Sequence, residues 1–149
     1  MKPIAKFTLA AFCLFSACEY KPQPDSPLIG TWQLLTHTEI TKGVSQVTDY
    51  TKDQKMIKII NGSHFAFLNH TLNTKKDSSN NFDGGGGAYT LNGDKYTEHL
   101  DYYKDKNWEG KSFDFTIKMK GDTLVQTGQE KVDKENINRT IIEKYVRMK

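Results

Sequence analysis

The stretch Phe113-Asp114-Phe115-Thr116-Ile117-Lys118-Met119-Lys120 alternates apolar and polar residues without a break. Side chains on a β-strand point to opposite faces in turn, so this period of two predicts a strand with one buried face and one face in water. Phe113, Phe115, Ile117 and Met119 form the expected buried face. Gly121-Asp122 follows as a turn. The stretch therefore predicts an antiparallel sheet whose neighbouring strands are joined by hairpins.

The same reading extends over most of the chain. Strands are predicted at residues 31–41, 44–50, 55–60, 64–68, 88–91, 96–103, 123–127 and 139–148. Asn61-Gly62 and Asn92-Gly93 are strong hairpin signals. Residues 73–87 are polar and glycine-rich and predict a loop, and residues 131–138 predict a charged turn. We expect an all-β protein with a single antiparallel up-and-down barrel of about 8–10 strands, because closure removes the exposed edges of a long meander.

The N-terminus has the features of an export signal. Lys2 and Lys6 precede an uncharged run, FTLAAFCLFSA, at residues 7–17. This run is too short to span a membrane and has the length of a signal-peptide apolar region. Phe15-Ser16-Ala17-Cys18 resembles the bacterial lipobox, with Phe where Leu is usual. We predict that residues 1–17 are removed as a lipoprotein signal peptide and that Cys18 is lipidated. Ordinary cleavage that leaves a free thiol is the alternative.

The remaining composition narrows the classes of partner. Residues 18–28 are rich in proline and predict a tether, and residues 29–149 form the expected barrel domain. The net charge of +3 falls towards neutrality without the two leader lysines, which gives no support for nucleic-acid binding. Cys13 and Cys18 are the only cysteines, and no histidines have zinc-site spacing. We expect no metal, no cofactor and no nucleic acid, and contact with a membrane through the lipid.

Gly30-Thr31-Trp32 opens the first long strand and resembles the Gly-x-Trp signature of lipocalins. In that superfamily the Trp plugs the closed end of the barrel and an Arg of the last strand packs across it. Arg147 is the best match for that Arg, with Arg139 second. The ordered pieces Lys58-Ile59-Ile60, His64-Phe65, the glycine run before Tyr89, Tyr96-Thr97-Glu98-His99 and Tyr145-Val146-Arg147 are similar to an uncharacterised family of bacterial lipocalin-like (calycin-type) lipoproteins. The resemblance implies the barrel fold and no known activity.

Several side chains are candidates for an interior site. Tyr96 and Glu98 share one strand face, and if that face points inward Glu98 needs a donor or a ligand. Glu143 and Tyr145 share a face with Arg139. This row predicts a site for a carboxylate or polar headgroup, an internal Arg–Glu pair, or a row on the outer surface of the barrel. Trp108 is either a lid over the barrel mouth or a plug for its loop. The expected apolar wall comprises Phe65, Phe67, Tyr89, Phe113, Phe115 and Met119.

Three classes of function fit these features. The first is a lipoprotein of the bacterial cell envelope whose barrel binds a small apolar or amphipathic ligand. The second is a structural or protein-interaction lipoprotein with a filled barrel. The third is an enzyme that uses Glu98 and a nearby histidine as acid and base. We expect the first and predict no catalytic residues.

Overall fold

Nine antiparallel strands make up most of the described chain. The computed structural model describes residues 26–72 and 82–149. The strands are β1 (Gly30–Thr41), β2 (Val44–Asp49), β3 (Gln54–Ile60), β4 (His64–Thr71), β5 (Phe82–Asn92), β6 (Lys95–Leu100), β7 (Lys111–Lys120), β8 (Thr123–Val132) and β9 (Ile137–Arg147). A short 3₁₀ helix, η1 (Asp133–Glu135), joins β8 to β9.

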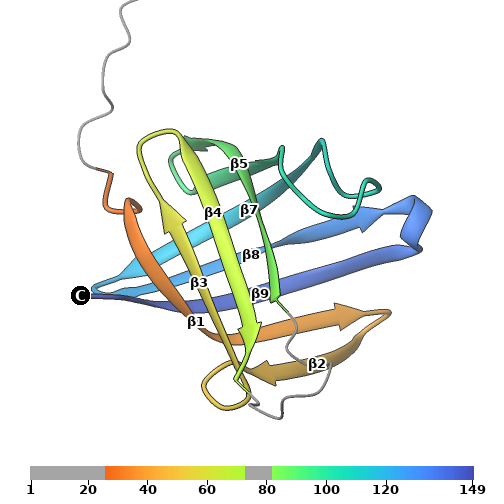
Figure 1. The fold of residues 1–149 in the computed structure, drawn as a ribbon, viewed down its shortest axis with the longest axis horizontal. Helices are drawn as coiled ribbons and strands as arrows, with labels where there is room; N and C mark the ends of the chain where they lie inside the picture. The colour runs from red at the N-terminus through yellow and green to blue at the C-terminus, as the bar shows by residue number, and fades with distance from the viewer. Residues whose placement is uncertain (1–25, 73–81) are drawn as a thin grey trace, which may run out of the picture.

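The sheet closes on itself. Its order is β2-β1-β3-β4-β5-β6-β7-β8-β9, and β1 also pairs with β9. Eight strands therefore form a closed barrel, and β2 is an additional strand (Figure 1). Every neighbouring pair is antiparallel, as the alternating pattern and the hairpin signals predict. The predicted fold class is confirmed.

Strand β1 changes partners along its length. Residues 30–33 pair with β3, and residues 36–41 pair with β2. The register of β1 against β9 shifts between Leu34 and Thr36, which marks a β-bulge. Bulges bend a strand, and Figure 1 shows β1 curving so that its second half runs with β2 along the lower edge of the molecule. This bend carries His37 and Glu39 to one end of the barrel.

The opposite end of the barrel is packed solid. Leu28, Trp32, Leu34, Leu124 and Tyr145 are wholly buried there. Trp32 Nε1 donates a hydrogen bond to the Leu28 carbonyl oxygen at 2.8 Å.

Arg147, and not the alternative Arg139, lies over the Trp32 ring. Its guanidinium lies 4.1 Å from the centre of the Trp32 ring. The same group donates hydrogen bonds to the carbonyls of Ile29 and Pro27. The strand ends around Trp32 form the base of the barrel.

The glycine run contradicts one prediction from the sequence. Gly84–Gly87 lies within β5 instead of a loop, and it pairs with β4 from Leu68 to Phe65. The backbone of residues 99–102 crosses close over β5, where Gly86 and Tyr102 exchange two backbone hydrogen bonds. A side chain at Gly87 would overlap the His99 carbonyl oxygen. Glycine is needed here for space, because another backbone passes directly above the strand.

Two smaller predictions are also corrected. Strand β8 extends to Val132, so the charged turn is shorter than residues 131–138. Met119, expected inside, is 37% exposed near the end of β7. The predicted signal peptide, Cys18 and residues 73–81 lie outside the described residues. In the described part of the chain, no helix has the length and apolar character needed to cross a membrane.

Candidate functional site: a cavity with a buried charge network

A cavity of about 320 Å³ occupies the half of the barrel away from Trp32. It extends to the strand ends at Glu39, Asn69, Asp83 and Arg139. The side chains of Glu39 and Asp83 are 35% and 30% exposed, so the cavity opens to solvent at this end, which we call the mouth. Cavities of about 300 Å³ and more are typical of small-molecule sites.

Aromatic side chains form one part of the lining. Trp108 lies with its ring centre 5.6 Å from that of Phe113 and 6.3 Å from that of Tyr103, and Tyr103 lies 6.1 Å from Phe67. Phe115 also lines the cavity. Trp108 thus packs into the aromatic cluster and also lines the cavity.

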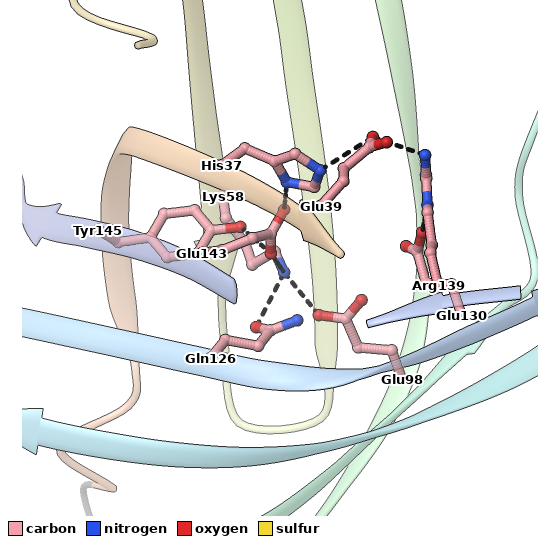
Figure 2. A network of polar contacts seen from close by, with 9 residues as sticks. All are labelled: His37, Glu39, Lys58, Glu98, Gln126, Glu130, Arg139, Glu143 and Tyr145. Atoms are coloured by element: carbon pink, nitrogen blue, oxygen red, sulfur yellow. Dashed lines mark hydrogen bonds and ion pairs between the residues drawn. The ribbon is translucent and has the colours of Figure 1, made fainter. Parts of the chain in front are cut away.

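Lys58 is the centre of the polar lining (Figure 2). Only 2% of this residue is exposed. Its Nζ donates to Glu98 Oε1 at 2.7 Å and to Gln126 Oε1 at 3.1 Å, and it lies 3.9 Å from Glu143 Oε2. The three partners come from β6, β8 and β9, so one ammonium group ties together strands far apart in the sequence.

Glu143 also contacts Tyr145 on its own strand, β9, and His37 on β1. The Tyr145 hydroxyl donates to Oε2 at 2.7 Å, and His37 Nδ1 lies 3.2 Å from Oε1. The other ring nitrogen of His37 lies 3.3 Å from Glu39 Oε1. An imidazole placed between two carboxylates donates to both only when it is protonated.

Arg139 completes the network at the mouth. Its Nε donates to Glu130 Oε2 at 2.7 Å, and NH1 donates to Glu39 Oε1 at 2.6 Å. The guanidinium also lies 6.0 Å from the centre of the Trp108 ring. Figure 2 shows the resulting chain of contacts from Glu130 through Arg139, Glu39 and His37 to Glu143.

The network shifts several pKa values. Burial alone would lower the pKa of Lys58, but the charges of Glu98 and Glu143 outweigh it and raise the pKa. Burial would raise the pKa of Glu143, yet Lys58 and His37 lower it. Lys58 and Glu143 are therefore held as an ion pair at neutral pH.

For His37, burial would lower the pKa, but the carboxylates of Glu143 and Glu39 outweigh burial and raise it. For Glu130, burial prevails over Arg139 and raises the pKa.

The structure divides the predicted site residues between two places. Phe67, Glu98, Phe113, Phe115 and Glu143 line the cavity. Phe65, Tyr89, Tyr96 and Tyr145 are buried but belong to the packed core and do not line the cavity. Tyr96 and Glu98 do share the inward face of β6, because both are buried.

The Tyr96 hydroxyl is a special case. Its oxygen is buried without a hydrogen-bond partner among the described residues. Burial, with the nearby Glu98 charge, raises the pKa of Tyr96 far above its ordinary range. This phenol therefore stays neutral and packs on Tyr89 and Phe115 as part of the core.

Sequence reasoning missed Lys58, Gln126, His37, Glu39 and Glu130. The inward position of Lys58 could not be predicted, because both faces of β3 carry isoleucine or methionine and neither is clearly the buried face. The pairing of Trp32 with Lys58 is the signal that identifies it. Directly opposed residues on neighbouring strands point to the same face, and Trp32 was expected inside.

Metal-ligating side chains do not form a cluster among the described residues. No three histidine, aspartate or glutamate side chains among them are arranged to hold a metal ion. Glu98, the expected acid–base candidate, contacts Lys58 rather than a histidine. The arrangement is that of a polar pocket with an aromatic side, and it has the features of a binding site.

Comparisons with known proteins give similar solved structures and no family. No protein-family model and no curated protein match the sequence. Among solved structures, the chain is similar to a lipocalin-like protein from Bacteroides uniformis ATCC 8492, with 16% identity and a TM-score of 0.49, over 81% of this chain and 98% of that one. It is also similar to an uncharacterized protein from Bacteroides eggerthii DSM 20697, with 14% identity and a TM-score of 0.46, over 80% and 98% of the two chains. Its own strand order and β1–β9 closure make this protein a closed, eight-stranded antiparallel β-barrel with one additional strand.

Proposed function

We propose that this protein is a binding module of the bacterial cell envelope, anchored to a membrane by lipid on Cys18, whose barrel holds one small amphipathic ligand. The observation that carries the proposal is the cavity of about 320 Å³, which opens at one end of a barrel whose other end is filled. A cavity of this kind combines apolar walls with a few polar groups that orient a ligand.

The lining supports an amphipathic ligand. The cluster of Phe67, Tyr103, Trp108 and Phe113 provides an apolar contact surface. Lys58 and its partners provide hydrogen-bonding groups held in fixed positions by one another. A rigid polar group of this type loses little conformational freedom on binding, which favours affinity.

A filled, structural barrel is the second candidate. It is favoured by the extent of the ion-pair network, in which Lys58 and Arg139 already have partners within the protein. The two candidates differ in whether the cavity holds a molecule when the protein is made in its own cells.

Native mass spectrometry of the protein purified from its own cells tests this difference. We expect a bound small molecule, and we expect Met56→Trp to displace it, because Met56 lines the cavity. Met119→Trp makes the same change at a position that is 37% exposed outside the cavity, and it should retain the ligand. Circular dichroism establishes that both variants fold. A wild-type protein without bound mass, or bound mass that persists in Met56→Trp, contradicts ligand binding in the cavity.

The anchor is tested separately. Cys18→Ser should remove lipid labelling and release the protein from the membrane fraction, because acyl chains provide the attachment. Cys13→Ser is the matched control, since Cys13 lies within the predicted signal and should be dispensable. Retention of Cys18→Ser on membranes would show that the anchor is elsewhere.

A further inference from the structure

The polar part of the cavity has more carboxylates than cations. Its charged lining within the described residues consists of Glu39, Glu98, Glu130, Glu143, Lys58 and Arg139, with Asp83 at the mouth. His37 adds a positive charge only when it is protonated. Asp83 is paired outside the cavity with the exposed Lys104 at 3.2 Å. Four inner glutamates therefore share two permanent cations, and an uncompensated buried charge is costly.

Both cations are already engaged by the protein. Lys58 Nζ contacts Glu98 and Gln126, and Arg139 contacts Glu130 and Glu39. A ligand carboxylate would meet the four glutamates and would have to displace one of them to reach a cation. This argues against the anionic headgroup that the Arg139 row suggested from the sequence.

The rest of the lining also favours positive charge. Phe67, Tyr103, Trp108 and Phe113 form a cluster of rings with centres 5.6–6.3 Å apart. The face of an aromatic ring is electrostatically negative, and clusters of this kind bind ammonium groups. Asn69 Oδ1, which is buried and lacks a donor among the described residues, adds a hydrogen-bond acceptor to the same lining.

We propose that the ligand is an organic cation, an amine or quaternary ammonium carrying a small aromatic or alkyl group, whose charge lies between the surplus glutamates and the Phe67–Tyr103–Trp108–Phe113 cluster. This rests on the proposed function, since it assigns the chemistry of a ligand in the same cavity.

The test compares three probes of similar size and different charge. Phenethyltrimethylammonium, 2-phenylethanol and 3-phenylpropionate are titrated by calorimetry into the Cys18→Ser chain, which retains every described residue. We expect the cation to bind roughly tenfold or more tightly than the alcohol, and the carboxylate to bind most weakly. Binding of the alcohol or the carboxylate as tightly as the cation overturns the inference and leaves the proposed function standing.

Charge variants locate the effect. Glu98→Gln removes one inner carboxylate with little change of shape, and it should weaken the cation roughly tenfold while leaving the alcohol unchanged. Asp94→Asn makes the same change of charge at an exposed hairpin position and should alter neither probe. Equal weakening by both variants, or no effect of Glu98→Gln, contradicts a role for the inner carboxylates.

Two further measurements separate the remaining outcomes. Displacement of the bound cation by phosphatidylcholine vesicles, but not by phosphatidylglycerol vesicles, identifies a lipid headgroup as the source of the ammonium, and no displacement identifies a free amine. If no probe binds, the molecule found by native mass spectrometry decides. A neutral or anionic molecule overturns the inference alone, whereas an empty barrel overturns the proposed function as well.

Discussion

Lys58 is a fully buried cation held by groups from three other strands. Moving an ammonium group out of water costs desolvation free energy. Short contacts with carboxylates in the low-dielectric interior offset this cost. The balance is asymmetric. A complete network contributes little net stability, whereas removing one member leaves the others buried and uncompensated.

Lys58→Met should destabilise the protein by about 3–5 kcal/mol, because Glu98 and Glu143 lose their cation. Adding Glu98→Gln should restore part of the lost unfolding free energy, because one of the two unpaired carboxylates is then removed. Urea unfolding measures all three proteins, with the exposed Lys118→Met as the control. A Lys58→Met protein as stable as the wild type would show that the ion pairs return no more than their desolvation costs.

His37 makes stability depend on pH. Its pKa is raised in the folded protein above the ordinary value of 6.5 by Glu143 and Glu39. Protonation then favours the folded state, so this contribution is complete below about pH 6.5 and is lost as the pH rises through the folded pKa. The wild type should therefore exceed His37→Gln in unfolding free energy most at pH 6, and the difference should shrink towards pH 9.

The control for this titration is His70→Gln, at an exposed position on β4. The change in stability difference between pH 6 and pH 9 should be larger for His37→Gln than for this control. An advantage of the wild type over His37→Gln that grows with rising pH has the wrong sign for a histidine stabilised in its charged form.

The strands were predictable where alternation and turns agree. Phe113–Lys120 needed only its period of two, and Asn61-Gly62 and Asn92-Gly93 lie where strands reverse. At the first of these turns the Asn61 side chain accepts hydrogen bonds from the Ser63 and His64 amides. The glycine run was not predictable, because glycine favours a loop by local conformation and the reason for it here is a second backbone crossing above.

Gly87→Ala tests that reason. The methyl group would overlap the His99 carbonyl and the Asp101 amide, so we expect a loss of about 1–3 kcal/mol. Gly62→Ala is the matched control, because nothing lies within 4 Å of its added carbon. It should change stability by no more than about 0.5 kcal/mol. Equal thermal unfolding of the two variants would mean that the backbone of residues 99–101 can shift to make room for the methyl group without loss of stability.

The whole molecule depends on closure between the first strand and the last. Pairing of β1 with β9 leaves the barrel without a free edge between them, and Arg147 fastens this seam to the chain that precedes β1. The fold could be predicted from the sequence because closure follows from strand number and turn signals. The candidate site could be predicted only in part, since its charges meet through pairings far apart in the sequence.

Arg147→Gln should lose the contact with the Trp32 ring and weaken the bonds to Ile29 and Pro27. A cation–π contact is worth about 0.5–2 kcal/mol, and a hydrogen bond to a charged group about 1.5–3 kcal/mol. We expect a lower unfolding midpoint and a changed near-ultraviolet signal from Trp32. Lys149→Gln removes a neighbouring charge that is 89% exposed and should leave both unchanged. An unaltered unfolding midpoint in Arg147→Gln would show that these Arg147 contacts do not stabilise the base of the barrel.

The chain enters the barrel at its base, where Leu28 lies under Trp32. Ten residues from Cys18 to Leu28 extend at most about 35 Å, while the 11 residues of β9 alone extend about as far. If lipid on Cys18 holds the protein to a membrane, the base of the barrel is the end next to the tether and the mouth is the end farthest along the barrel from it. A ligand of the cavity would then enter at the end of the barrel opposite the anchor.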